Sequence, residues 1–150
     1  SNHSDRIWRA TSLDLDKNLA RELKFINNYV GVLGLRRIKV GKVSYNIVLC
    51  HGQSMGADPW RDAHKALKIY PFADAVMLSH THECDWKEHP RFNNRKRQIK
   101  TTLLRTGSVI NYPRYAKQAL YSPKVKGFNI VYLDDTKKRI KADITGEVPY

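Results

Sequence analysis

Apolar residues recur along the chain with two different periods, one typical of helices and one typical of strands. Between Ile7 and Ile26 they return every three, four or seven positions, with Lys and Arg between them, which predicts an amphipathic helix. We expect this helix to break near Ser12. Tyr29–Cys50 carries short apolar, largely β-branched runs between glycines, and Gly41-Lys42 is predicted to be the turn of a β-hairpin.

Two continuous apolar runs predict strands that are buried on both faces. They are Tyr45–Cys50 and Ala73–Leu78. Between them, Asp58-Pro59 is expected to supply an N-cap and a proline at the first helical position. The helix that starts there is expected to run toward Tyr70 and to end at Pro71. This order of strand, helix and strand is typical of an α/β domain.

The second half of the chain predicts strands rather than helices. Trp86–Ile110 is basic and mixed, and Thr101–Arg105 is its best candidate for a strand. Phe128–Leu133 and Arg139–Ile144 are predicted to be two strands joined by a turn at Asp134-Asp135-Thr136-Lys137. No repeat, low-complexity tract or linker divides the sequence, so residues 1–150 are expected to form a single domain.

Composition adds a strong positive charge to this picture. Lys and Arg number 27 against 14 Asp and Glu, a net charge of +13, while 41% of the residues are hydrophobic, as in folded proteins. The charge favours a polyanionic ligand such as nucleic acid, although a merely soluble surface explains it too. No apolar run reaches the roughly 18 residues of a membrane span and no secretory signal is present, so we expect a soluble cytoplasmic protein without a membrane partner.

The cysteines and two of the histidines are expected to have no chemical role. Cys50 and Cys84 lie far apart without a CxxC motif, so they are interpreted as reduced, partly buried thiols. His64 and His89 are expected to be solvated. Asp62-Ala63-His64 mimics a metal-binding Asp-x-His, but a helix would turn its side chains to different faces.

The other candidate ligands follow the two buried strands. His51 comes directly after the first, and His80 and His82 follow the second. The carboxyl edge of an open α/β sheet is where sites form. Residues two apart on an extended segment lie about 6.6 Å apart on the same side, which suits two ions roughly 3.5–4 Å apart or two imidazoles on one ion. The competing interpretation is that these histidines are ordinary loop residues.

Several short motifs occur in a fixed order along the chain. They are Asn2-His3, His51-Gly52, Ser79-His80-Thr81-His82 and Arg105-Thr106-Gly107-Ser108, with Tyr115, Pro123 and Gly127-Phe128 downstream. In this order they resemble the calcineurin-like metallophosphoesterases. The resemblance extends over most of the chain and implies an α/β (α+β) fold, a metallophosphoesterase-like β-sandwich flanked by helices.

The resemblance also implies roles for individual residues. Asn2, His51 and His80 would ligate one divalent metal, and His82 would reach a second. His3 would be catalytic, because it would stabilise the transition state or protonate the leaving oxygen. Members of the family hydrolyse phosphoesters with a water activated by two ions. Mn²⁺ is the expected metal, and Zn²⁺ or Fe the next choice.

The sequence departs from the family pattern at several positions. Ser1, Ser4 and Ser79 replace two glycines and an acidic residue, and no Gly-Asp dipeptide, the source of the bridging ligand, is present. Ser1-Asn2 also fits a pair left by an expression vector. We therefore expect the C-terminal half of such a domain, binding one ion or none by itself. An upstream N-terminal half or a second copy is the expected partner for full activity.

A basic cluster suggests the substrate. Arg91, Arg95, Lys96 and Arg97 are expected to line a cationic groove beside the histidines, with Trp86 and Phe92 as platforms for stacking. This favours phosphodiesters, nucleic acid among them, over small phosphomonoesters. The alternative is a non-catalytic nucleic-acid-binding or subunit protein that uses the same surface, and a solvated basic face remains the plainest explanation.

Overall fold

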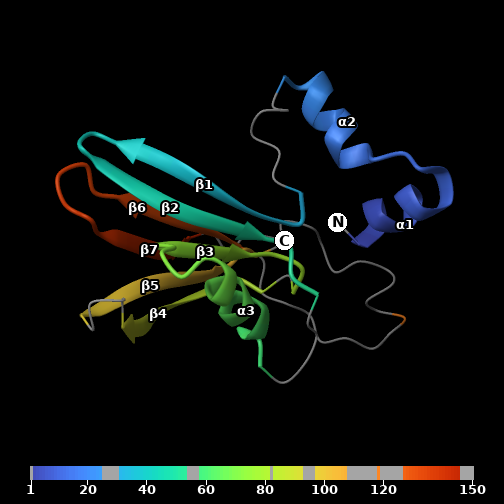
Figure 1. Cartoon of the computed structure of the whole chain (residues 1–150). Helices are drawn as coiled ribbons and strands as arrows, with labels where there is room; N and C mark the ends of the chain where they lie inside the picture. Colours follow the sequence, from blue (N-terminus) through green and yellow to red (C-terminus); the bar gives the residue numbers. More distant parts are fainter. Residues whose placement is uncertain are drawn as a thin grey trace.

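The chain opens with two short helices that stand beyond the end of the sheet (Figure 1). The computed structural model describes residues 2–24, 31–53, 58–81, 83–92, 97–107, 118 and 127–145, with the backbone alone at 2–6 and 145. The predicted break is confirmed, because Ser12 has a φ of 58° between the helices. Asp14 caps the second helix by accepting a hydrogen bond from Lys17 N at 2.9 Å. The helices are α1 (Asn2–Thr11) and α2 (Leu15–Glu22).

Five strands form the main sheet, in the order β1-β2-β3-β5-β4. The outer pairs β1–β2 and β4–β5 are antiparallel, whereas β2, β3 and β5 run parallel to one another. The carboxyl ends of these three strands therefore meet at one edge, which we call the carboxyl edge. The strands are β1 (Leu33–Val40), β2 (Val43–Cys50), β3 (Ala75–Leu78), β4 (Asp85–Phe92) and β5 (Gln98–Arg105).

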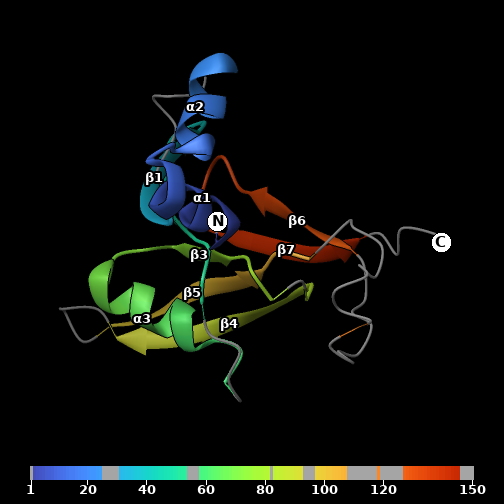
Figure 2. The same cartoon turned by 90° about the vertical axis from the view of Figure 1, so that its right-hand side faces the viewer.

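Different elements cover the two faces of this sheet (Figure 2). On one face α3 (Arg61–Ile69) packs through buried alanines and Leu67. On the other face an antiparallel hairpin of β6 (Phe128–Leu133) and β7 (Ile140–Thr145) buries Ala142. The predicted mixed α/β sandwich flanked by helices is confirmed for the described residues.

The tips of two hairpins touch each other. The predicted turn at Gly41 is confirmed, because Val40 pairs with Val43 across it. Gly41 has a φ of 55°, and a Cβ there would lie 2.7 Å from the carbonyl oxygen of Asp135. Lys42 N donates a hydrogen bond to that same oxygen at 3.1 Å. Only glycine therefore permits this close approach.

A buried tyrosine ties the small sheet to the large one. Tyr45 of β2 is fully buried, and its hydroxyl donates a hydrogen bond to the Asp134 carbonyl at 2.6 Å. Arg139 N donates to the same hydroxyl at 3.2 Å. The Asp134 carboxylate accepts hydrogen bonds from Thr136 N and Oγ1 and from Lys137 N, and these bonds hold the pKa of Asp134 well below its usual range.

Two predicted boundaries are corrected. The helix begins at Arg61 rather than at Pro59, because the Asp58 carboxylate accepts from Trp60 N at 2.9 Å in a turn before the helix. The candidate strand Thr101–Arg105 is part of β5, which begins earlier, at Gln98, and β4, which begins at Asp85, was not predicted. β4 escaped notice because it is an edge strand, where Pro90 and charged side chains are tolerated.

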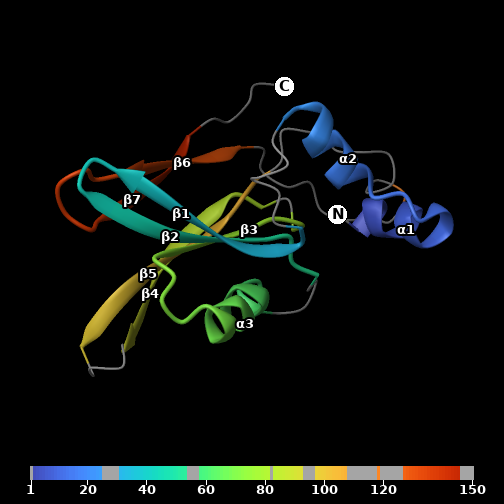
Figure 3. The same cartoon turned by 45° about the horizontal axis from the view of Figure 1, so that its top comes forward.

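The two N-terminal helices leave apolar side chains exposed. Figure 3 shows α1 and α2 apart from both sheets, at the end where β2 terminates. Trp8, Leu19 and Leu23 are all more than half exposed on them. In the described part of the chain, no helix is long and apolar enough to cross a membrane.

Replacing Tyr45 by Phe tests the tie between the sheets. The change leaves the Arg139 N–H without its acceptor and the Asp134 carbonyl without its hydroxyl donor. We therefore expect the free energy of unfolding to fall by about 1–3 kcal/mol. Tyr132→Phe is the matched control, since Tyr132 is 51% exposed, and it should change stability by less than about 0.5 kcal/mol. Urea unfolding measures both, and equal effects of the two variants would contradict the tie.

Candidate metal site at the carboxyl edge

Strand register brings two of the candidate histidines together. Cys50 of β2 pairs with Leu78 of β3 in the parallel ladder, and Ser79 N donates to the Cys50 carbonyl at 3.0 Å. The residues that follow these strands, His51 and His80, therefore lie side by side. Their ring centroids are 5.2 Å apart, with an angle of 63° between the ring planes.

Ser79 orients the His51 ring. Its Oγ lies 3.1 Å from His51 Nδ1 and donates to the His51 carbonyl at 3.3 Å. The Ser79 hydroxyl and His51 Nδ1 therefore share a hydrogen bond whose direction depends on the tautomer of the ring. In the family resemblance Ser79 only takes the place of a glycine. Its contact with the His51 ring was not predicted from the sequence.

The backbone at His80 is unusual. Its φ is 82°, in the left-handed region that side chains other than glycine rarely occupy. Next to it, Thr81 Oγ1 is buried and has no hydrogen-bond partner in the part of the chain that the structure describes. A strained residue beside an unpaired polar atom is typical of a binding site.

The loop after His51 is held from α3. Gly52 has a φ of 76°, and a Cβ there would lie 2.8 Å from Leu78 Cδ1, so glycine is required. Asp62 Oδ2 accepts a hydrogen bond from Gln53 N at 2.7 Å. Asp62 thus anchors this loop, a role that its sequence position does not reveal.

The thiols remain protonated near neutral pH. Cys50 and Cys84 are free and partly buried, as predicted. Burial raises the pKa of the Cys50 thiol above its ordinary value, with the Asp62 charge adding to the shift and a hydrogen bond from Gly52 opposing it. Burial likewise raises the pKa of Cys84. Neither thiol is therefore a good thiolate ligand.

The pair of histidines fits a divalent metal in its donor type and spacing. Two imidazoles on one tetrahedral ion, with metal–nitrogen distances of about 2.0–2.1 Å, have ring centroids about 5 Å apart. In the described part of the chain, however, no set of three His, Cys, Asp or Glu side chains surrounds a common point. Among the described residues, His51 and His80 are thus two candidate ligands with no third candidate beside them.

The remaining candidate ligands are only partly described. His82 lies outside the described residues. Asn2 and His3 are described by their backbone, in the first turn of α1. Figures 1 and 3 show the start of α1 at the same end of the sheet as the carboxyl edge.

Two residues of the basic cluster, Arg91 and Arg97, do not border the histidines. Arg91 donates hydrogen bonds to Thr101 Oγ1 and to the Ala73 carbonyl, both at 2.6 Å, at the start of β3. His80 follows the end of β3, roughly 20 Å away at about 3.3 Å per residue. Arg97 precedes β5 at the same far end. Arg95 and Lys96 lie outside the described residues. The expected cationic border is wrong for Arg91 and Arg97, because β4 and β5 form an antiparallel hairpin that carries them away.

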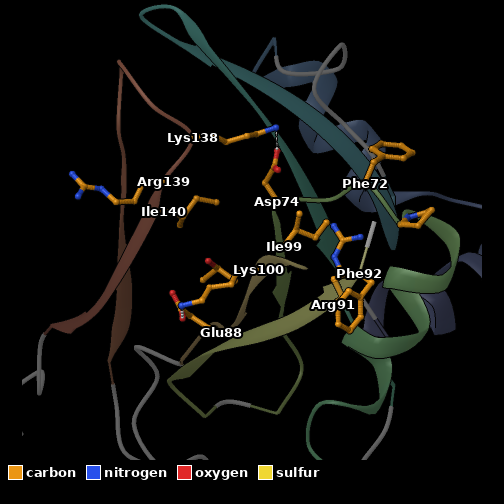
Figure 4. A pocket seen from close by; sticks show the side chains of 12 residues that line it. Phe72, Asp74, Glu88, Arg91, Phe92, Ile99, Lys100, Lys138, Arg139 and Ile140 are labelled. Carbon is orange, nitrogen blue, oxygen red and sulfur yellow. Dashed lines mark hydrogen bonds and ion pairs between the residues drawn. The ribbon is translucent and has the colours of Figure 1, made fainter. Parts of the chain in front are cut away.

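A groove of about 860 Å³ does open at that far end (Figure 4). The exposed rings of Phe72 and Phe92 stand at one side of it. Its lysines are neutralised, since Lys138 pairs with Asp74 at 2.9 Å and Lys100 pairs with Glu88.

Arg105 has a structural role. It is buried, and its guanidinium pairs with Glu83 and with Asp85. It also lies over the Trp60 ring, with 5.0 Å between the guanidinium carbon and the ring centroid. Arg105 therefore contributes to packing at the carboxyl edge rather than to an open cationic surface.

Comparison with known proteins gives distant similarities in structure. No protein-family model matches the sequence, and no curated protein matches it. Vps29 from Entamoeba histolytica, solved in complex with Zn²⁺, is 19% identical over 74% of this chain, with a TM-score of 0.41. This chain covers 59% of the length of that Vps29. Protein TM1076 of Thermotoga maritima is 18% identical over 88% of this chain and 74% of its own length, with a TM-score of 0.40.

Alkylation of Cys50 tests the electrostatics of the carboxyl edge. Because burial disfavours the thiolate, iodoacetamide should label Cys50 slowly at pH 8 in the folded protein. The labelling rate should rise only at pH values above those at which a free thiol reacts. Peptide mapping by mass spectrometry separates Cys50 from Cys84, and urea-unfolded protein is the control. Equal rates in folded and unfolded protein at pH 8 would contradict the raised pKa.

Proposed function

We propose that this chain is a portion of a calcineurin-like metallophosphoesterase domain that takes part in the divalent-metal-dependent hydrolysis of phosphodiesters. The observation that carries the proposal is the pairing of His51 with His80. Their centroid separation of 5.2 Å at the carboxyl edge suits one shared ion. The order of the motifs in which these histidines occur agrees with the same family.

The protein residues have distinct tasks in this proposal. His51 and His80 hold a metal, with Ser79 Oγ fixing the ring of His51. Asn2 and His82 are the further ligands, and His3 donates a proton to the leaving oxygen. A bound divalent metal supplies a Lewis acid and a more acidic water at this edge.

Charge favours an anionic substrate. The net charge of +13 attracts phosphodiesters, nucleic acid included. We propose Mn²⁺ as the metal. The sequence holds no Gly-Asp dipeptide to supply a bridging carboxylate, so we further propose that an upstream half or a second copy of the chain completes the site.

Titration with Mn²⁺ tests the site, with the electron paramagnetic resonance signal of the free ion as the readout. Each of His51→Ala and His80→Ala should weaken the Mn²⁺ affinity by about tenfold or more, because each removes a ligand. Lys68→Ala, an exposed truncation on α3, should leave the affinity unchanged. Mn²⁺ binding that is indifferent to both histidines would overturn the proposed site.

Hydrolysis of bis(p-nitrophenyl) phosphate in the same samples tests completeness. The isolated chain should show little turnover with Mn²⁺, since its sequence holds no Gly-Asp dipeptide to supply the bridging carboxylate. Rapid Mn²⁺-dependent turnover that is lost in His80→Ala would contradict the need for an upstream half while supporting the phosphoesterase chemistry, because a second copy of the chain is the only proposed partner present in the sample. Failure of both binding and turnover would reject the function itself.

A further inference from the structure

A second pair of histidines lies away from the carboxyl edge. His64 of α3 and His89 of β4 face each other, with ring centroids 5.0 Å apart and 42° between the ring planes. Both were expected to be solvated; both are half-buried, and they contact each other. β4 alternates its side chains, so His89 lies on the face that Lys87 shares, where Lys87 Nζ stands 4.9 Å from the Trp60 ring centroid.

The two nitrogens of His64 have different surroundings. Nδ1 lies 3.7 Å from Asp58 Oδ2. Nε2 is buried and has no hydrogen-bond partner among the described residues. A carboxylate at one nitrogen of a histidine, with the other nitrogen left for a ligand, is the usual arrangement around protein-bound metals.

Spacing suits a metal. A centroid separation near 5 Å is the value expected for two imidazoles on one tetrahedral ion. The side chains of His64 and Asp58 are 36% and 52% exposed, so the pair lies at the margin of solvent, while the His64 Nε2 atom itself is buried.

Neighbouring charges limit the affinity. Lys87 and Arg91 repel a cation at this position, and Asp58 is the carboxylate that offsets them. Imidazole ligands favour Zn²⁺, Cu²⁺ and Ni²⁺ over hard ions such as Mg²⁺. The site should therefore select a borderline divalent ion and depend strongly on Asp58.

We propose that His64 and His89 form a second site for a borderline divalent metal such as Zn²⁺, with Asp58 positioning His64. This site is separate from the one at the carboxyl edge and does not depend on the proposed hydrolase function. It joins α3 to β4, an edge strand of the sheet on which α3 packs.

Titration with Zn²⁺ tests this proposal, with the long-range ¹H–¹⁵N NMR correlations of the histidine rings as the readout. The signals of His64 and His89 should shift together with one saturating stoichiometry. His64→Ala should abolish the response of His89 while the responses of His51 and His80 persist. Mg²⁺ at the same concentration should leave the signals of His64 and His89 in place.

The positioning role of Asp58 has its own test. Asp58→Asn should weaken Zn²⁺ binding at this pair by about 10- to 100-fold. Asp143→Asn removes an exposed carboxylate on β7 and controls for the general loss of negative charge. Zn²⁺ shifts confined to His51 and His80, or a His89 response that survives His64→Ala, would overturn the second site. Equal effects of the two Asp variants would overturn the role of Asp58.

Discussion

Parallel pairing of β2, β3 and β5 is the constraint from which the candidate site follows. Cys50 lies beside Leu78 and Leu78 lies beside Arg105, so three chain segments leave the sheet at one edge. A shift of one residue in either ladder would turn the apolar side chains to the opposite face. The register of the β2–β3 ladder therefore sets the separation of the two histidines.

The same strand links the site to the second sheet. β2 carries Tyr45 near its start and ends just before His51. The Tyr45 hydroxyl holds the turn of the β6–β7 hairpin, and Asn129 of β6 donates to the Arg105 carbonyl at 3.0 Å. Both contacts reach the central strands, so the small sheet supports the carboxyl edge from one face of the main sheet. On the other face, Asp62 of α3 holds the loop after His51 by its hydrogen bond with Gln53 N.

Sequence patterns predicted the elements that are set by residues adjacent in the chain. The strands ending at His51 and His80 are short apolar runs, and the β6–β7 turn carries its own signals, so these were predicted. The His64–His89 contact was not, because it joins a helix to a strand that reads as a charged loop. The position of Arg91 was predicted wrongly for a similar reason. The sequence pattern did not predict the β4–β5 hairpin, which places Arg91 at the far end of the sheet.

The most direct test of this account is the position of a metal at the carboxyl edge. Anomalous scattering from crystals grown with Mn²⁺ locates the ion without reference to activity. The account predicts a peak within coordination distance of a ring nitrogen of both His51 and His80. A peak bound to only one of these residues, or no peak at that edge in crystals with bound Mn²⁺ elsewhere, would contradict the shared site.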